Sequence, residues 1–310
     1  MIGMLGFGSV LGSRVLTNED ICASIPGLTP EWVLAKLGLK RRYYATSDQT
    51  ADTMALGAAQ KALASADIRG SDLDIVVVCT FTGELAFPPV SAGLHRALGM
   101  SGGQFYDLAA ACSGFLSGLT AVADRMTADS SLRYALVVGT ELMSPYIDPT
   151  DYETAPYFSD GAGAIVLGRS DHGIVSSAFY ADTSDYDLVR CKRDGYAEMK
   201  GLVTGKQAVA HLPDTMDRAM TAAGWRHEDA DLYVFHQANE HLISYFMNRM
   251  HLPMERTYTN VAEIGNLGVA SIPVALVDVA ENGLLKRGDN LVLASVGAGF
   301  GFSSSCWKWS

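Results

Sequence analysis

Two segments of the 310-residue chain, 157 positions apart, resemble each other. Residues 66–75 read ADIRGSDLDI and residues 223–232 read AGWRHEDADL, so that Asp72 corresponds to Asp229. The same offset lays the apolar run at 134–137 over the apolar run at 291–294. Because two separate pairs share one offset, the sequence indicates a duplicated unit. We therefore predict two halves, residues 1–170 and 171–310, arranged around one shared site.

Apolar runs that are typical of strands alternate with helical stretches, which predicts an α/β fold. The runs are dense in β-branched residues and lack a clean alternation, as expected of strands covered by helices on both faces. We expect strands at 75–78, 135–138, 164–167, 232–235 and 291–293. We expect helices at 51–66, 113–126, 207–223 and 271–282.

Composition and charge exclude several classes of protein. The chain has 23 Lys and Arg against 34 Asp and Glu, a net charge of −11, which argues against binding to nucleic acid or to an anionic membrane. No apolar run approaches the ~18–20 residues of a membrane span. The start, Met1–Met4, lacks the basic n-region and the apolar h-region of a signal peptide, so we expect none. The five cysteines form no CxxC pair, so we expect neither a metal site nor a disulfide framework. We expect a cytoplasmic protein.

Cys112 is the candidate nucleophile. It follows three alanines, Ala109 to Ala111, and precedes a predicted amphipathic helix. At a helix start the dipole and the free N–H groups favour the thiolate, so we expect a lowered thiol pKa. The other four cysteines, which have no comparable setting, are expected to be inert: Cys22, Cys79, Cys191 and Cys306.

The repeat relates Cys112 to two further candidates. The offset maps Cys79 onto His236, which ends an apolar strand, and maps Cys112 to position 269, near Asn266. Ligands of α/β sheets gather beyond the carboxyl ends of strands. We therefore expect Cys112, His236 and Asn266 to meet around one pseudo-twofold axis. Ala298 and Gly299 follow another strand, where backbone N–H groups could stabilise an oxyanion.

These motifs together resemble the β-ketoacyl-acyl carrier protein synthase III group of the thiolase superfamily, essentially from end to end. The segments that carry the resemblance are Glu31-Trp32-Val33, Ala109–Phe115, Phe158–Ala164, His236–Asn239 and Gly265-Asn266. The resemblance implies a duplicated, five-layered α-β-α-β-α fold.

The resemblance also implies roles. Cys112 would take an acyl group from an acyl thioester, and His236 and Asn266 would bind a malonyl-type thioester and stabilise the enolate left by CO2 loss. The backbone N–H groups of Cys112 and of the Ala298-Gly299 segment would form the oxyanion hole. Coenzyme A or phosphopantetheine thioesters, the latter on an acyl carrier protein, would be substrates, and no permanent cofactor is implied.

Further contacts follow from the same resemblance. Substrate-binding positions would be Trp32, Lys36, Phe87, Asn239 and Gly201, and the segment Phe87-Pro88 would close the acyl pocket of a partner subunit in a homodimer. Lys36 stands where the group has an arginine, and a lysine lacks the planar stacking fork. A basic cluster of Lys36, Lys40, Arg41 and Arg42 could meet an acidic carrier or a pyrophosphate.

Three functions remain open from the sequence. The first is decarboxylative condensation to a β-ketoacyl product, in a specialised pathway (polyketide, alkylquinolone or resorcinol-like) or in fatty-acid synthesis. The second is acyl transfer from Cys112 to an oxygen or nitrogen nucleophile, with His236 as general base. The third is a partner subunit of a heterodimeric synthase, which the complete Cys-His-Asn set disfavours.

Overall fold

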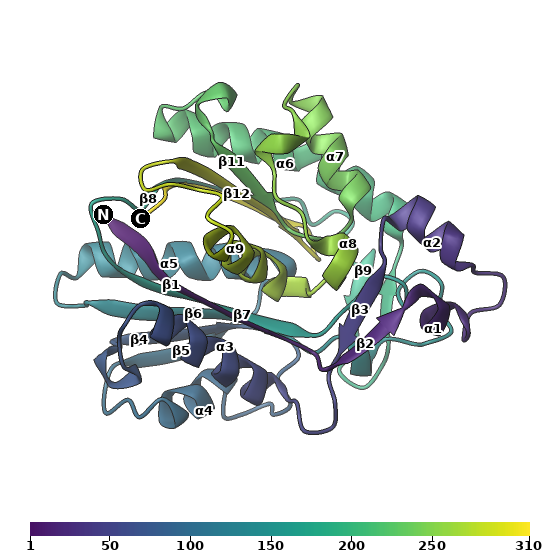
Figure 1. The fold of residues 1–310 in the computed structure, drawn as a ribbon, viewed down its shortest axis with the longest axis horizontal. Coiled ribbons are helices and arrows are strands. Elements are labelled where there is room, and N and C mark those ends of the chain that lie inside the picture. The colour runs from purple at the N-terminus through teal and green to yellow at the C-terminus, as the bar shows by residue number, and fades with distance from the viewer.

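The protein is a stack of five layers, two β-sheets alternating with three layers of helices (Figure 1). The computed structural model describes residues 1–310, apart from the side chain of Leu202. The first sheet has the order β1 (Ile2–Leu11), β7 (Gly161–Arg169), β6 (Tyr134–Glu141), β4 (Ile75–Cys79), β5 (Gln104–Leu108). The second has the order β11 (Leu232–Phe235), β12 (Asn290–Gly297), β13 (Gly301–Lys308), β8 (Ile174–Ala181).

Three pairs of helices complete the layers. The central pair lies between the sheets, and the outer pairs cover the first and the second sheet from outside (Figure 1). The central helices are α5 (Gly114–Ala128) and α9 (Ser271–Glu281). The outer helices are α3 (Ala51–Ser65) and α4 (Val90–Ala97) on the first sheet, and α6 (Gly201–Ala223) and α7 (Glu240–Arg249) on the second.

The duplicated fold that the sequence predicted is confirmed. β4 runs parallel to β6 and β11 runs parallel to β12, while β6–β7 and β12–β13 are antiparallel. β4 and β11, and likewise α5 and α9, begin 157 positions apart. The second sheet replaces a fifth strand by a single parallel bridge between Tyr233 and Thr257. The division into 1–170 and 171–310, which falls in the connection from β7 to β8, stays a prediction.

The main core lies between the two sheets. Leu116 and Leu119 of α5 and Leu276 of α9 are buried there against Val137 of β6 and Leu293 of β12. The strands have apolar residues on both faces, because α3 and α4 cover the other face of the first sheet and α6 and α7 that of the second. This explains why the strand sequences show no alternation.

Shorter elements gather at the end of the stack where α2 lies (Figure 1). They are α1 (Asn18–Cys22), α2 (Pro30–Leu37), α8 (Val261–Ile264), β2 (Arg14–Thr17), β3 (Arg41–Tyr44), β9 (Val189–Cys191) and β10 (Ala197–Met199). Arg42 of β3 is fully buried and donates to Asn18 Oδ1 and to the carbonyl of Pro156, 2.7 Å from its Nε. This guanidinium therefore links β3 to α1 and to the loop before β7.

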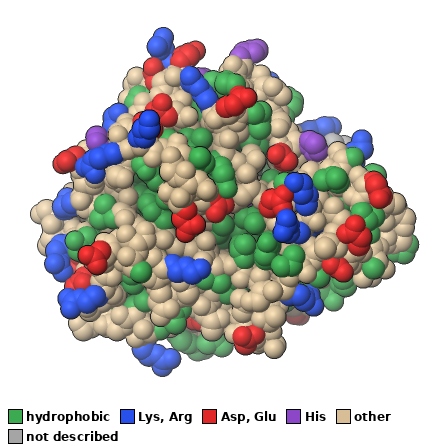
Figure 2. All heavy atoms as spheres, in the orientation of Figure 1, with side chains coloured by type: hydrophobic (Ala, Val, Ile, Leu, Met, Phe, Trp, Pro, Cys, Tyr) green, Lys and Arg blue, Asp and Glu red, His purple; other side chains and the backbone are tan. Residues whose placement is uncertain are grey.

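The expected strands and helices are all present, with one boundary clearly displaced. α6 begins at Gly201, six residues before the predicted start, since Gly201 and Gly205 weaken the helical signal there. Among the helices of the described chain, none is both long enough and apolar enough to cross a membrane. On the face drawn in Figure 2, acidic and basic side chains are interspersed.

The two halves make a close backbone contact at Gly297, the last residue of β12. A Cβ added there would lie 2.8 Å from the carbonyl oxygen of Ala110 and from the nitrogen of Ser113. We expect Gly297→Ala to lower the free energy of unfolding by ~1–3 kcal/mol, because backbone atoms must move to admit the methyl group. Chemical denaturation measures the change.

Gly102→Ala is the matched control, because a Cβ at Gly102 meets no atom within 4 Å. Equal unfolding free energies for the two variants would contradict the account of this contact.

Candidate active site

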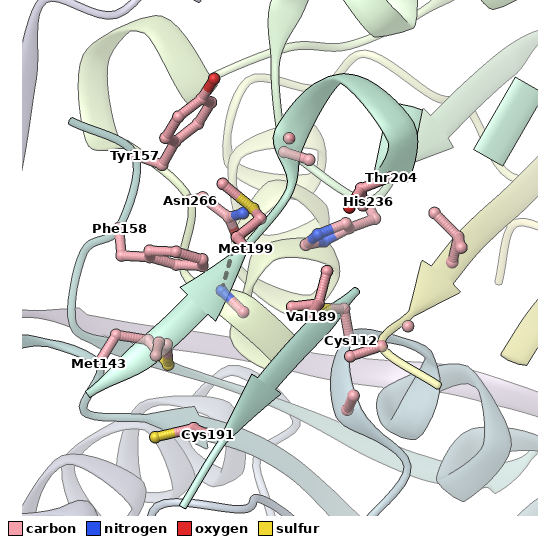
Figure 3. Close-up of a pocket in the computed structure, with 18 of the residues that line it drawn as sticks. Cys112, Met143, Tyr157, Phe158, Val189, Cys191, Met199, Thr204, His236 and Asn266 are labelled. Atoms are coloured by element: carbon pink, nitrogen blue, oxygen red, sulfur yellow. Dashed lines mark hydrogen bonds between the residues drawn. The ribbon is translucent and has the colours of Figure 1, made fainter. Parts of the chain in front are cut away.

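A cavity of about 1340 Å³ opens where the two halves meet, and Cys112, His236 and Asn266 all line it (Figure 3). Cys112 comes from the first half, and His236 and Asn266 come from the second. The predicted meeting of these three side chains is therefore found in the structure.

Cys112 lies in a short 3-10 turn, η2 (Ala111–Ser113), directly before α5. Its neighbour Ala111 has φ +46°, a conformation that non-glycine residues rarely adopt and that clusters at functional sites. The turn is tied to the second half because Ser295 Oγ of β12 donates to the Cys112 carbonyl at 2.8 Å. A strand of the second sheet thus holds the cysteine in place.

The expected lowering of the Cys112 pKa is wrong. Burial raises the pKa of this thiol to about 12, since the thiolate would lose its hydration, and the nearby Glu141 acts in the same direction. A backbone hydrogen bond opposes the shift without overcoming it. Cys112 is therefore a neutral thiol at pH 7.

His236 follows β11 and is buried. Its backbone N–H donates to the Ala294 carbonyl of β12 at 2.8 Å, which fixes its position beyond the strand end. Its Nδ1 lies 2.6 Å from Ser271 Oγ at the start of α9. Burial lowers the pKa of His236 to about 4, so that the imidazole is neutral at pH 7.

Asn266 lies in a turn between α8 and η6 (Gly268–Ala270). Its backbone N–H donates to the Tyr157 carbonyl, and its own carbonyl accepts from the Ser159 N–H at 2.8 Å. The side-chain Oδ1 accepts from the Gly268 N–H at 2.9 Å. Because Oδ1 is held by this bond, the Nδ2 group remains as a hydrogen-bond donor for a ligand in the cavity.

Comparison with known proteins agrees with this arrangement. Residues 106–183 match the family described as 3-oxoacyl-(acyl-carrier-protein) synthase III, and residues 220–309 match its C-terminal part. A β-ketoacyl-(acyl-carrier-protein) synthase III of Alkalilimnicola ehrlichii is 38% identical over 99% of this chain and 98% of its own.

The chain belongs to the 3-oxoacyl-(acyl-carrier-protein) synthase III family.

Solved structures of the family superpose closely on this member. The Aquifex aeolicus synthase III has a TM-score of 0.95 and 31% identity, with 100% of each chain covered. A priming β-ketosynthase of a polyketide biosynthetic pathway also has a TM-score of 0.95, with 29% identity over 100% of this chain and 96% of its own.

The further predicted site residues divide into two groups. Lys36, Gly201, Asn239 and Ala298 line the cavity, whereas Trp32, Phe87 and Gly299 are not among the described lining residues. Asn239 also caps α7, since its Oδ1 accepts from the N–H groups of the second and third helical residues, His241 and Leu242.

The predicted basic cluster is not a free cationic patch in this family member. Lys40 and Arg41 both form ion pairs with Glu263 of α8, each at 2.7 Å, and Arg42 is buried. Only Lys36 of the four lines the cavity. The sequence could not reveal this, because Glu263 is more than 200 positions away from its partners.

Two features of the site escaped the sequence analysis. The hairpin β9–β10 contributes Val189, Cys191 and Met199 to the cavity wall, so that Cys191 lies at the site and not apart from it. Glu141, fully buried at the end of β6, accepts from the Phe81 N–H and from Thr82 Oγ1 and so positions that part of the wall. A carboxylate directly after an apolar strand was the available signal.

The neutral state of His236 can be tested by NMR. Because the folded pKa is about 4 against 6.5 in an exposed histidine, the ring should stay neutral from about pH 8 to pH 5. The unfolded chain binds this proton below about pH 6.5, whereas the folded chain binds it only near pH 4. The free energy of unfolding should therefore fall as the pH drops from about 6.5 to about 4. A histidine ring titration, with the His236 signal assigned from a His236→Gln variant, measures the pKa, and a midpoint near 6.5 would contradict the prediction.

Proposed function

We propose that this family member is a ketosynthase that acylates Cys112 and then joins the acyl group to a malonyl-type thioester with loss of CO2. One observation carries the proposal: a thiol and two neutral hydrogen-bond donors line the same cavity. Acyl thioesters supply all the atoms that the two steps need, so the proposal includes no permanent cofactor.

In the first step the Cys112 sulfur attacks the carbonyl carbon of an acyl thioester. The new C–S bond forms, the old C–S bond breaks, and the thiol proton leaves with the departing coenzyme A or phosphopantetheine thiol. The oxyanion that develops is stabilised by backbone N–H groups at Cys112 and at the Ala298-Gly299 segment. Of these residues, Cys112 and Ala298 line the cavity.

In the second step His236 and Asn266 donate hydrogen bonds to the thioester oxygen of the malonyl-type substrate. The bond to the carboxylate breaks, CO2 leaves, and the enolate attacks the acyl carbon on Cys112. The cysteine leaves as a thiolate and takes a proton from solvent. Neutral donors suit this step, because they stabilise an enolate without removing a proton, whereas a carboxylate at the position of Asn266 would repel it.

The lining of the cavity suits thioester substrates. Part of its wall is apolar and includes Met143, Phe158 and Met199, which suits an acyl chain. Lys36, Lys206 and Arg249 also line it and are cations that suit the phosphates of coenzyme A or of a carrier-bound phosphopantetheine.

We propose that the protein acts in the cytoplasm, either in a specialised pathway or in fatty-acid synthesis. The relatives support both pathways, since they include synthases III and a polyketide priming enzyme. The presence of Lys36, in place of the arginine usual in the group, favours a primer or carrier other than the standard ones.

A homodimer is part of the proposal. β5 is an edge strand of the first sheet, and near it the exposed apolar side chains Leu85 and Phe87 (84% exposed) belong to the loop that ends at α4. A sheet edge beside exposed apolar residues is typical of an interface.

We expect Phe87→Asp to convert a dimer into a monomer, since a charge would have to be buried in the interface. Light scattering after size-exclusion chromatography measures the mass. Leu284→Asp, at an exposed leucine after α9, is the control and should remain dimeric. A wild-type protein that is monomeric at all concentrations would contradict the prediction.

The two chemical steps can be separated by variants. Incubation with acyl-coenzyme A donors of varied length, or with acyl carriers, should add one acyl mass to wild-type protein and none to Cys112→Ala. Asn266→Ala should still form the adduct but lose roughly 100-fold in CO2 release from a malonyl thioester, because a preorganised oxyanion donor is removed. Intact-mass spectrometry and CO2 release measure the two steps.

Asn248→Ala, at an exposed asparagine of α7, is the matched control and should retain both steps. Failure of every donor to acylate Cys112 would overturn the proposal. Acylation followed by ester or amide formation without CO2 release would instead support the acyl-transfer alternative.

A further inference from the structure

The contact between Ser271 and His236 determines more than the position of the histidine ring. Ser271 is the first residue of α9 and is 1% exposed. Its Oγ lies 2.6 Å from His236 Nδ1 and 3.3 Å from the backbone nitrogen of Gln237. The three polar groups are buried together, so their hydrogens have to be shared among themselves.

The Gln237 N–H can only donate, and it donates to the Ser271 oxygen. Within the described chain, Ser271 Oγ has two hydrogen-bond partners, the Gln237 N–H and His236 Nδ1, and of these only His236 Nδ1 can accept the hydroxyl hydrogen. If Nδ1 carried a hydrogen itself, two donors would point at the same oxygen and the hydroxyl hydrogen would be left buried and unpaired, which is unfavourable. The arrangement in which every hydrogen is used has Ser271 donating to an unprotonated Nδ1.

We propose that Ser271 is a positioning residue that holds His236 in the tautomer with its hydrogen on Nε2, so that the ring donates into the cavity. The inference rests on the proposed function, in which His236 donates to the malonyl thioester. It also opposes the acyl-transfer alternative, since an imidazole with hydrogen on Nε2 presents no lone pair to a nucleophile in the cavity.

The same segment orients the second donor. The Gly268 N–H holds Asn266 Oδ1 and leaves Nδ2 for the ligand, just as the Ser271 hydroxyl holds Nδ1 and leaves Nε2. In Figure 3 the Asn266 amide and the His236 ring lie on the same side of the cavity. One short stretch, residues 268–271, therefore aims both hydrogen-bond donors.

The duplication places a different residue at the matching position of the first half. α5 begins at Gly114, 157 positions before Ser271, and directly follows the turn with Cys112. A Cβ at Gly114 would lie 3.3 Å from Val269 Cγ2, which is a tight contact. The first copy therefore has a glycine at the start of α5, where it approaches the turn before α9. Only the second copy has a hydroxyl at this point, and it is the copy that contains the histidine.

The test begins with NMR of wild-type protein labelled with 15N in its histidines. The chemical shifts of the two ring nitrogens show which of them carries the hydrogen. His236→Gln assigns the signal. We expect hydrogen on Nε2 and none on Nδ1. A signal from the Nδ1–H tautomer would overturn the inference whether or not the protein is a ketosynthase.

The kinetic arm compares Ser271→Ala, Ser271→Thr and Ser304→Ala. We expect Ser271→Ala to reduce CO2 release roughly tenfold through loss of one buried hydrogen bond, while acylation of Cys112 stays within about twofold, and Ser271→Thr to restore most of the rate. Ser304→Ala removes a similarly buried hydroxyl, which donates to the Leu293 carbonyl away from the cavity lining, and should retain both rates.

Equal losses in acylation and CO2 release in Ser271→Ala, or no loss in either, would overturn the positioning role. If wild-type protein releases no CO2 with any donor, the proposed function fails, and the tautomer measurement still decides the inference about Ser271.

Discussion

The close approach of two backbone segments, the end of β12 and the turn that contains Cys112, is the constraint on which the site depends. Gly297 lies against Ala110 and Ser113 without room for a side chain, and Ser295 Oγ donates to the Cys112 carbonyl. Since β12 also holds His236 through the Ala294 carbonyl, one strand positions groups from both halves. A shift of this strand would displace the nucleophile and a hydrogen-bond donor together.

The duplication explains why such a junction exists. Each copy provides a helix that starts beyond the end of its strands, and α5 and α9 both contribute to the core between the sheets. Packing the two copies face to face brings both helix starts to one place, where ligands of α/β folds bind. At the matching turns before these helices, Cys112 of the first copy corresponds to Val269 of the second.

The sequence was sufficient for the parts that depend on pattern and spacing. The apolar runs located β4, β6, β7, β11 and β12, and the constant offset brought Cys112, His236 and Asn266 together. The sequence was insufficient for ion pairs and pKa values that depend on residues distant in the chain. The ion pairs of Glu263 and the raised pKa of Cys112 depend on neighbours that only the folded chain brings close.

The separation of charge within the cavity follows from the same burial. Around Cys112 the thiol and His236 are both neutral at pH 7, and burial raises the pKa of Glu141 well above its ordinary value. Cations such as Lys36 and Arg249 lie elsewhere along the lining. A malonyl-type substrate would bring a carboxylate, which a fixed cation beside it would stabilise against CO2 loss. A neutral pair of donors does not, so the negative charge would meet its strongest hydrogen bonds only when it moves to the enolate oxygen.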